Sequence, residues 1–280
     1  VLDEATLVAT IRRHRVTGVV HLAGKKRVDE SVLRPMFYHQ QNVLGVKVLL
    51  RSMRCCGVNR IVFSSSCAVY GDAEGLAIDE SAIPRPVSPY GRTKLTGEQL
   101  VQAAGVDSGM QWISLRYFNV AGAGTPALGD AAEVNLIPMT FRALAESRAP
   151  HIFGGDYPTP DGTCVRDYIH VSDVVDAHLA AVERLERGRV AAVYNVGRGS
   201  GVSVREIMTS IADVTGRRFD PLVVARRPGD PASVVASAGL IEAELGWTAR
   251  LELSDIIRSA WAAWAAHDPA PQPECVVADG

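Results

Sequence analysis

The sequence predicts an α/β protein with a doubly wound parallel sheet, in which helices cover both faces of the strands. Two observations lead to this fold class. Helical and strand-like segments alternate over the first 120 residues, and the strands are continuous apolar runs, as strands buried on both faces are. We expect a first domain at residues 1–120 and a smaller α/β lobe over most of residues 121–280. Part of residues 170–200 is expected to return to the first domain.

The predicted elements follow from periodicity and from residues that begin or end helices. Asp3 and Glu4 begin an amphipathic helix that ends near His14, and Gly57 ends a second helix that starts near Pro35. Apolar runs predict strands at 18–24, 60–66, 111–117 and 192–196. Helical periodicity predicts further helices at 90–104, 172–185, 203–214 and 253–266.

The composition of the chain changes after Asn119. Residues 121–126 and 153–160 are rich in glycine and proline, unlike the regular alternation of helices and strands before them. Such segments are typical of loops. The change therefore predicts that the second lobe begins here.

Composition and charge argue against several classes of function. With 29 Lys+Arg and 31 Asp+Glu the formal net charge is −2, which does not favour a nucleic acid or an anionic membrane as partner. There is no apolar run of the roughly 18 residues that a membrane span needs and no signal-peptide pattern, so we expect a soluble, cytoplasmic protein. The five cysteines are odd in number and lack metal-ligand spacing, so we expect reduced thiols and no metal site.

The segment from Ser88 to Lys94 carries the clearest chemical signal. Ser88 can cap a helix, Pro89 suits its first turn, and Tyr90 and Lys94 then lie one turn apart on the same helix face. A neighbouring ammonium favours the ionised form of a phenol and lowers its pKa, so this pair can serve as a general base. Taken alone, a Tyr-x-x-x-Lys pair is also common as an ordinary exposed pair on a helix.

A run of three serines strengthens the chemical interpretation. The strand predicted at 60–66 ends in Ser64, Ser65 and Ser66, and the carboxyl ends of strands are where open α/β sheets bind ligands. A hydroxyl at this place can exchange a proton or a hydrogen bond with a substrate oxygen while Tyr90 acts as the base. The alternative role is that of a turn residue that satisfies backbone groups.

Several motifs together resemble the UDP-glucose 4-epimerases, which belong to the extended short-chain dehydrogenase/reductases. Four of them are FSSSCAVYG at 63–71, SPYGRTK at 88–94, RYFN at 116–119 and GTCVRDYIH at 162–170. HLAG at 21–24, the Glu30-Ser31 pair and RRPGD at 226–230 match as well. The resemblance extends from about Val1 to Ala266, with the motifs in the order and at the spacing of the family.

The resemblance implies tightly held NAD as cofactor and a UDP-sugar as substrate. It implies that Tyr90 removes the proton of the sugar 4-hydroxyl while hydride passes from C4 to the nicotinamide. The 4-keto sugar then turns over, and hydride returns to its opposite face. Lys94 is implied to hold the nicotinamide ribose and to lower the Tyr90 pKa, and Ser66 to contact the sugar hydroxyl. The two domains are then an NAD-binding domain and a UDP-sugar-binding lobe.

The remaining site residues are implied by the same correspondence. Phe118 is implied to line the nicotinamide side. The cofactor residues are Leu22, Ala23, Gly24, Lys26, Gln41, Ser64, Tyr90, Lys94 and Phe118. The substrate residues are Ser66, Asn119, Asn135, Leu136, Phe153, Arg166, Arg227, Asp230 and Ser233.

Elementary chemistry supports the two arginines independently of the resemblance. A diphosphate suits the rigid forks of guanidinium groups, and Arg166 and Arg227 lie in segments rich in glycine or proline. Surface salt bridging is their alternative role. Asp230 is expected either to accept hydrogen bonds from ribose hydroxyls or to pair with Arg226.

Other features are expected to be structural. We expect His170 to have a structural role, because the resemblance assigns proton transfer to Tyr90, and we expect Cys67 and Cys164 to be packing residues. The resemblance also implies a homodimer, in which the helix predicted at 35–56 and the Tyr90 helix supply the interface. The apolar residues of these helices can equally face the sheet.

The sequence departs from the family pattern at its start. The family begins with a strand, a glycine-rich turn and a helix that binds the pyrophosphate. The early glycines here are Gly18, Gly24 and Gly45, which do not form G-x-G-x-x-G. By comparison with the family, Val1 corresponds to a point just after an acidic residue that contacts adenine. We therefore expect the natural protein to be longer, the sheet to expose a central strand edge, and this chain to retain little NAD.

Two single positions also differ from the family. Gln41 precedes Asn42 where the family usually has two asparagines, and its amide lies one methylene farther from the backbone. Ser233 stands where a bulky aromatic residue closes the sugar pocket in members restricted to glucose and galactose. A small residue leaves room for an N-acetyl group, so we hypothesise activity on UDP-N-acetylglucosamine as well as on UDP-glucose.

Three alternative functions were compared with this interpretation. A sugar-nucleotide 4,6-dehydratase needs an acidic residue after the strand-end hydroxyl, where this chain has Cys67 and Ala68, so dehydration is disfavoured. A 4-epimerase of pentose or uronate UDP-sugars remains open, because the shape of the pocket decides it. A catalytically inactive fragment that binds a nucleotide-sugar also remains open, since the glycine-rich loop is missing although Ser66, Tyr90 and Lys94 are present.

Overall fold

The computed structural model describes residues 1–72, 77–130, 132, 134–227 and 229–267. Its α-helices are α1 (Glu4–Arg13), α2 (Val28–Leu33), α3 (Pro35–Tyr38), α4 (Gly45–Cys55), α5 (Pro89–Ser108), α6 (Leu136–Ala145), α7 (Val171–Glu186), α8 (Val204–Thr215), α9 (Gly239–Leu245) and α10 (Leu253–His267). Its strands are β1 (Val19–His21), β2 (Arg60–Ser66), β3 (Gln111–Tyr117), β4 (Asn119–Ala121), β5 (His151–Phe153), β6 (Val165–His170), β7 (Ala191–Val196), β8 (Gly201–Ser203), β9 (Leu222–Val224) and β10 (Ser233–Val234).

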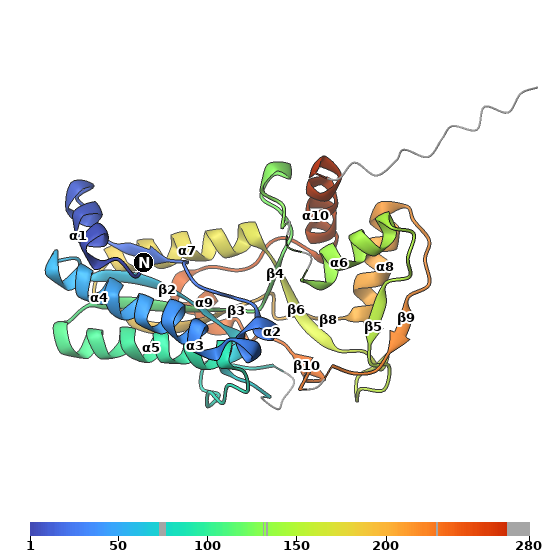
Figure 1. Ribbon diagram of the computed structural model, residues 1–280, viewed down its shortest axis with the longest axis horizontal. Helices are drawn as coiled ribbons and strands as arrows, with labels where there is room; N and C mark the ends of the chain where they lie inside the picture. Colours follow the sequence, from blue (N-terminus) through green and yellow to red (C-terminus); the bar gives the residue numbers. More distant parts are fainter. Residues whose placement is uncertain (73–76, 131, 133, 228, 268–280) are drawn as a thin grey trace, which may run out of the picture.

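The main sheet has four parallel strands in the order β1-β2-β3-β7 (Figure 1). In the register of β2 and β3, Arg60 pairs with Gln111 at one end and Ser66 with Tyr117 at the other. The carboxyl ends of the two central strands therefore lie side by side. β7 pairs with β3, so this late segment of the chain returns to the first sheet. The parallel α/β architecture predicted from the sequence is confirmed.

Helices cover both faces of the main sheet, as Figure 1 shows. On one face α1, α4 and α5 pack against Ile61 and Phe63 of β2. On the other face α7 and α9 pack against Val62 and Ile113. Because side chains alternate along a strand, successive residues of β2 enter different cores. This double burial is the physical reason for the apolar runs in the sequence.

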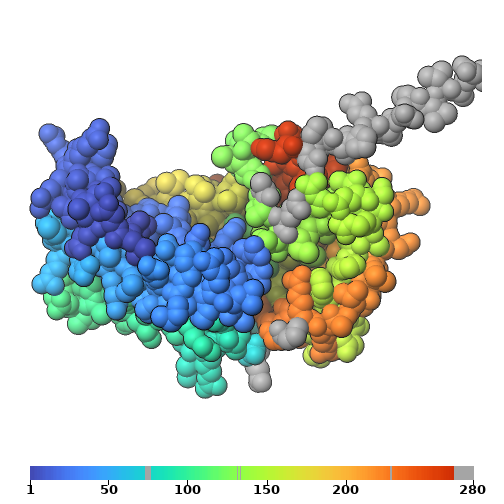
Figure 2. Space-filling model, viewed as in Figure 1, coloured from blue at the N-terminus to red at the C-terminus, as the bar shows by residue number. Residues whose placement is uncertain are grey.

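The second lobe is built around a sheet of β10, β6 and β4, in which β8 pairs antiparallel with β6. β5 and β9 form a separate parallel pair. Ile137 and Phe141 of α6, Ile207 of α8 and Ile256 of α10 share one hydrophobic core. In Figure 2 the dark blue residues at the start of the chain and the green-to-orange residues of this lobe lie at opposite ends of the molecule.

The segment predicted as one helix at 35–56 is helical but interrupted. A π-helical turn, His39–Leu44, separates α3 from α4. Such turns are often associated with functional sites, and periodicity does not reveal them. The sequence analysis did not identify α2 and α9, or the short strands of the second lobe, because each has fewer residues than a clear periodic pattern needs. It also did not identify α6, which has ten residues.

The apolar run at 18–24 forms a strand of only three residues, β1. Within the described chain β1 pairs with β2 alone, so its other edge has no partner strand there. Val20 is 43% exposed and Leu22 is 64% exposed, although the run was predicted to be a buried strand. The expectation of an open strand edge with exposed apolar surface agrees with these values.

Three further observations concern the described residues. Among the described helices, none is long and apolar enough to cross a membrane. The four cysteines in the described ranges are free thiols, and the fifth, Cys275, lies outside those ranges. The described residues also contain no cluster of His, Cys, Asp or Glu that could hold a metal ion.

Candidate active site

A cavity of about 1000 Å³ lies where the carboxyl ends of β2 and β3 face the second lobe. Ser66 and Tyr117, at the ends of these strands, line it together with Tyr90 at the start of α5. Residues of β4, β6, α6 and α10 form the wall on the side of the second lobe. The cavity therefore lies at the strand ends, where an open α/β sheet is expected to bind its ligand.

The first turn of α5 is fixed as the sequence predicted. The Ser88 hydroxyl accepts a hydrogen bond of 3.0 Å from the backbone N–H of Gly91, and Pro89 begins the helix. A Cβ atom on Gly91 would lie 2.4 Å from the carbonyl oxygen of Ala68. A Cβ on Gly97 would lie 2.5 Å from the Phe63 ring. Gly97 allows α5 to approach β2 closely, and Gly91 allows it to approach the turn that follows β2, so the start of the helix lies at the strand end.

Tyr90 lies at the centre of the arrangement and is 9% exposed. Its backbone N–H donates a hydrogen bond of 3.1 Å to Ser31 Oγ, which fixes the backbone at this point. Burial raises the pKa of Tyr90 to about 12, and the hydrogen bond with the Ser66 side chain opposes this shift. The pKa-lowering effect of Lys94 that the resemblance implied is not evident here, and burial dominates.

Lys94 lies one helical turn after Tyr90 and is half-buried, with its Nζ 5.9 Å from the centre of the Tyr90 ring. Its Nζ donates a hydrogen bond of 2.9 Å to the backbone oxygen of Ser64 and lies 5.6 Å from the centre of the Phe63 ring. Burial lowers the pKa of Lys94 to about 8, and the negative charge of Glu98 opposes this shift. The amine is thus close to losing its proton at a mildly alkaline pH.

The three serines of β2 make different contacts. Ser64 Oγ lies 2.7 Å from the hydroxyl of Tyr117. Ser65 Oγ donates a hydrogen bond to a carboxylate oxygen of Glu98 on the α5 side of the sheet. Ser66 interacts with Tyr90. Alternation along the strand sends neighbouring serines to opposite faces of the sheet, so one short motif connects to both helical layers.

Glu98, one helical turn after Lys94 on α5, forms a buried ion pair with Arg116 of β3. Arg116 Nε and Nη2 donate to the two carboxylate oxygens of Glu98 at 2.9 and 2.7 Å, and the two side chains are 6% and 7% exposed. Arg116 Nη1 also donates to the Tyr70 hydroxyl at 2.9 Å, and this hydroxyl donates to Asn195 Oδ1 at 2.7 Å. This network joins α5 to β3 and β7. Sequence analysis did not predict it, although a charged residue inside an apolar strand was a usable signal.

Asn42 in the π-helical turn is a second residue that the sequence analysis did not assign to the site. Its Oδ1 accepts a hydrogen bond of 2.8 Å from the backbone N–H of Lys25, and its Nδ2 donates to Lys25 O and to Thr93 Oγ1, both at 3.0 Å. Asn42 thereby joins the loop after β1 to α5. The sequence assigned cofactor contact to the neighbouring Gln41, whose side chain is only half-buried.

The charged groups of the second lobe pair differently from the sequence expectation. Asp230 forms an ion pair with Arg166, and both residues line the cavity. Arg226, the partner considered from the sequence, instead binds Asp156, with 2.7 Å between Nε and Oδ1. The guanidinium of Arg227 lies over the ring of Phe153, 4.0 Å from its centre. These differences arise because β6 brings residues 166 and 230 together across the fold.

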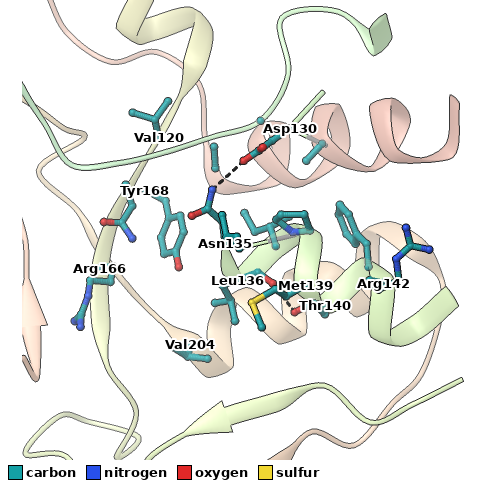
Figure 3. Close-up of a pocket in the computed structure, with 18 of the residues that line it drawn as sticks. Val120, Asp130, Asn135, Leu136, Met139, Thr140, Arg142, Arg166, Tyr168 and Val204 are labelled. Atoms are coloured by element: carbon teal, nitrogen blue, oxygen red, sulfur yellow. Dashed lines mark hydrogen bonds between the residues drawn. The ribbon is translucent and has the colours of Figure 1, made fainter. Parts of the chain in front are cut away.

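Figure 3 shows the part of the cavity formed by α6 and β6, which Asn135, Arg166 and Tyr168 line. The Asn135 amide donates a hydrogen bond of 2.8 Å to Asp130 Oδ2, which fixes its orientation. Tyr168 is buried and lies next to Asn119 across the paired strands β4 and β6. Polar groups therefore lie among apolar residues in this part of the cavity, an arrangement typical of a small-molecule site.

Most of the predicted site residues converge on this single cavity. Those that line it are Ser66, Tyr90, Lys26, Phe118, Asn119, Asn135, Leu136, Phe153, Arg166, Arg227 and Asp230. Those that do not line it are Lys94, Leu22, Ala23, Gly24, Gln41, Ser64 and Ser233.

Three of these residues lie next to the residues that line the cavity, and one faces another way. A Cβ atom on Gly24 would lie 3.7 Å from Lys94 Nζ, and Lys94 binds Ser64, so these residues are adjacent to the lining residues. Ser233 pairs with Val165 in the register of β10 and β6, whereas the cavity-lining Arg166 pairs with the next residue along. Because side chains alternate along a strand, Ser233 points to the face opposite Arg166.

His170 has the surroundings of a structural residue. Its Nδ1 accepts a hydrogen bond of 3.0 Å from the backbone N–H of Ser172 at the start of α7, and its Nε2 lies 2.9 Å from Ser259 Oγ. Burial lowers its pKa.

Cys67 and Cys164 both line the cavity, and burial raises their pKa values, to about 12 for Cys67. A thiol with a raised pKa is a poor nucleophile.

Comparison with known proteins assigns the chain to a family. Residues 1–197 match the model of the NAD dependent epimerase/dehydratase family. The chain belongs to this family. A UDP-glucose 4-epimerase from Azospirillum brasilense is 44% identical over 255 residues, which cover 89% of this chain and 73% of that protein. Both the family and the resemblance predicted from the sequence motifs are thereby confirmed.

Solved structures agree with this assignment. A UDP-glucose 4-epimerase from Stenotrophomonas maltophila, with bound NAD and formylated UDP-arabinopyranose, has a TM-score of 0.92 and 39% identity, covering 96% of this chain and 82% of that one. A UDP-Glc/GlcNAc 4-epimerase from Campylobacter jejuni has a TM-score of 0.82 and 34% identity, covering 94% of this chain and 81% of that one.

Proposed function

We propose that the protein is an isomerase that interconverts UDP-glucose and UDP-galactose by NAD-dependent epimerisation at C4, a reaction of galactose metabolism. The observation that carries the proposal is the placement of Tyr90 and Ser66 in one cavity with Arg166 and Arg227. A phenol and a hydroxyl suit proton exchange with a sugar hydroxyl, and guanidinium groups suit a diphosphate. The confirmed family membership supports both proposed roles, proton exchange with the sugar and binding of the diphosphate.

The residues behind the cavity fit the nicotinamide ribose of NAD. Lys94 Nζ has Ser64 O as its one hydrogen-bond acceptor among the described residues, so two of its N–H groups are free to bind a ribose diol. Gly24 lies next to this ammonium, and a Cβ there would lie 3.2 Å from Asn42 Oδ1. Lys94, with Gly24 near it, would therefore hold this end of the cofactor, and Phe118 lines the adjacent cavity. When bound, NAD supplies the hydride acceptor and a positive charge.

Tyr90 acts as the base in this proposal, and Ser66 positions the sugar hydroxyl. The buried phenol has a pKa of about 12 in the structure, so a positive charge close to it is needed before it can accept a proton near neutral pH. Lys94, one helical turn away with its Nζ 5.9 Å from the centre of the Tyr90 ring, supplies a part of that charge while it is protonated. The Ser66 hydroxyl lines the same cavity and lowers the pKa of Tyr90, so it is placed to transmit the proton to and from the sugar oxygen.

The second lobe holds the UDP part of the substrate in this proposal. Arg227 is placed over the Phe153 ring and Arg166 is fixed by Asp230, so both guanidinium groups are oriented before the substrate arrives. Groups that are already oriented lose less conformational entropy on binding. Asn135 offers an oriented amide at the same wall. The diphosphate would bind between the arginines and place the sugar towards Tyr90.

The proposed reaction is tested by conversion of UDP-galactose to UDP-glucose with NAD added to saturation. We expect the Tyr90→Phe variant to lower kcat by about 10² to 10⁴, the usual contribution of a general base. Tyr194→Phe is the matched control, because it removes another buried hydroxyl, bonded to Glu244 and outside the cavity, and is expected to keep kcat. Absence of conversion by the NAD-saturated wild type would contradict the proposed function and favour a protein that only binds nucleotide-sugars.

The amount of NAD retained by the purified chain is a separate measurement. The sequence predicts little retained NAD, because the 280 residues contain no G-x-G-x-x-G motif. The quantity to measure is moles of nucleotide released on denaturation per mole of chain. A value near one would contradict this prediction and show that the cofactor site assembles without that motif.

UDP-N-acetyl and pentose sugars are proposed as further substrates. The relative from Campylobacter jejuni is described as a UDP-Glc/GlcNAc epimerase, and the Stenotrophomonas maltophila structure holds a formylated UDP-arabinopyranose. The cavity of about 1000 Å³ has room for larger groups on the sugar. Because Ser233 faces away from the Arg166 wall, we expect Ser233→Tyr to leave the ratio of rates for UDP-galactose and UDP-N-acetylgalactosamine unchanged.

We further propose a homodimer in the cytoplasm. Met36 of α3 is 77% exposed and Val106 of α5 is 86% exposed, and both belong to the helices that the sequence analysis proposed as an interface. The free thiols of the described cysteines fit a reducing compartment. Light scattering of the purified protein measures its mass in solution, and a monomer at micromolar concentration would contradict the dimer.

A further inference from the structure

His178 of α7 is in contact with the cavity wall through one tyrosine. Its Nε2 lies 2.6 Å from the Tyr117 hydroxyl, which in turn lies 2.7 Å from Ser64 Oγ. Its Nδ1 lies 2.8 Å from the backbone oxygen of Val174, and the two rings have centroids 5.4 Å apart. The four groups therefore form one continuous chain of hydrogen bonds from α7 to the end of β2.

The direction of these hydrogen bonds follows from counting protons. A carbonyl oxygen only accepts, so His178 Nδ1 must carry a proton. Burial lowers the pKa of His178, which keeps the ring neutral and leaves Nε2 as an acceptor. The Tyr117 hydroxyl has one proton, and it must donate this proton to Nε2. Ser64 Oγ–H then donates to the Tyr117 oxygen.

This series of hydrogen bonds ends at groups that belong to the proposed site. The Tyr117 side chain lines the cavity, and the backbone oxygen of Ser64 accepts the hydrogen bond from Lys94 Nζ. The orientation of Ser64 is thus fixed from two sides, by the helix that carries Tyr90 and Lys94 and by α7 on the opposite face of the sheet. The phenol and hydroxyl oxygens at this point are left with lone pairs only, so they can accept but not donate.

We propose that His178 is a positioning residue of the epimerase site, which holds the Tyr117 ring and the Ser64 hydroxyl in one fixed hydrogen-bond direction. This inference rests on the proposed function, since it concerns the same cavity. His178 does not itself reach the cavity lining. Its effect on turnover is therefore transmitted through Tyr117, and removal of either residue should have the same consequence.

The hydrogen-bond direction can be measured without any turnover. NMR of protein labelled with isotopic nitrogen in histidine reports which ring nitrogen carries the proton, and a His178→Gln sample assigns the signal. We expect the neutral Nδ1–H form at neutral pH, and we expect Tyr117→Phe to shift the Nε2 resonance towards that of an unbonded nitrogen. A proton on Nε2 would overturn the proposal, because the hydrogen bonds among His178, Tyr117 and Ser64 would then run in the opposite direction.

The consequence for turnover is tested with four variants. His178→Phe keeps a ring without nitrogen, Tyr117→Phe removes the hydroxyl, and each is expected to lower kcat about tenfold with KM within about twofold, the effect of one lost hydrogen bond. The kcat of the double variant should be no more than about twofold lower than that of either single variant, because both substitutions break the same series of hydrogen bonds. His178→Gln retains an acceptor oxygen and should restore kcat to within about threefold of the wild type.

The matched control is Leu179→Ala, the next residue on α7, whose side chain is 56% exposed. It is expected to keep kcat, and thermal melting of every variant separates folding defects from the kinetic effect. A His178→Phe protein with wild-type kcat, or a double variant whose losses multiply, would overturn the proposal. If the wild type does not interconvert the sugars at all, the proposed function fails, and the NMR result still decides the hydrogen-bond direction.

Discussion

The buried ion pair between Glu98 and Arg116 gives the sharpest stability prediction. In Glu98→Gln the shape of the side chain is kept, but Arg116, with a side chain only 6% exposed, loses its negative partner. Leaving one member of a buried ion pair without its partner typically costs about 3–5 kcal/mol. Since a change of 1 kcal/mol shifts the melting temperature of a chain of this size by roughly 2–4 °C, we expect a decrease of about 6–20 °C.

The assay is thermal unfolding followed by circular dichroism, with two comparisons. Asp107→Asn breaks the exposed ion pair with Arg54, whose side chains are 75% and 72% exposed, and should change the free energy of unfolding by less than about 0.5 kcal/mol. The double variant Glu98→Gln/Arg116→Met should be more stable than Glu98→Gln alone, because it removes the buried charge that lost its partner.

A second observable connects this pair to the proposed site. Glu98 lies one helical turn after Lys94, and its charge raises the Lys94 pKa. Glu98→Gln should therefore lower the pH at which Lys94 loses its proton. A melting temperature of Glu98→Gln within about 2 °C of the wild type would refute the reasoning, because it would show that Arg116 is solvated or paired in another way.

Three further predictions concern the helix and the cavity. Gly91→Ala should destabilise the protein by about 1–3 kcal/mol through the clash with Ala68 O, whereas Gly239→Ala, with open space around it, should change unfolding by less than about 0.5 kcal/mol. The Lys94 pKa is lowered in the folded state from 10.5 to about 8, so its contribution to the free energy of unfolding should rise by about 3 kcal/mol between those pH values. Chemical unfolding of Lys94→Met should lack that rise. Arg227→Lys should raise KM for the UDP-sugar about tenfold with kcat within about twofold, because a bidentate fork is lost, and an unchanged KM would contradict its assigned role.

Sequence alone predicted the parts of the fold that depend on local pattern. The strands of the main sheet were recognisable because burial on both faces makes them apolar throughout, and the start of α5 because Ser88 and Pro89 satisfy the requirements of a helix terminus. Local chemistry also identified Tyr90 and Ser66, which the cavity brings together. These features depend on residues close together in the chain.

The tertiary structure decided the contacts that join distant segments. Asp230 binds Arg166 rather than Arg226, Arg116 of β3 pairs with Glu98 of α5, and Ser233 faces away from the cavity. Each of these depends on strand register, which a single sequence does not specify for short strands. The sequence by itself thus determined the family and the candidate catalytic groups, through helix and strand signals that act locally. Only the packing of the strands and helices determined charge pairing, burial and therefore the pKa values, because these depend on what lies nearby in space.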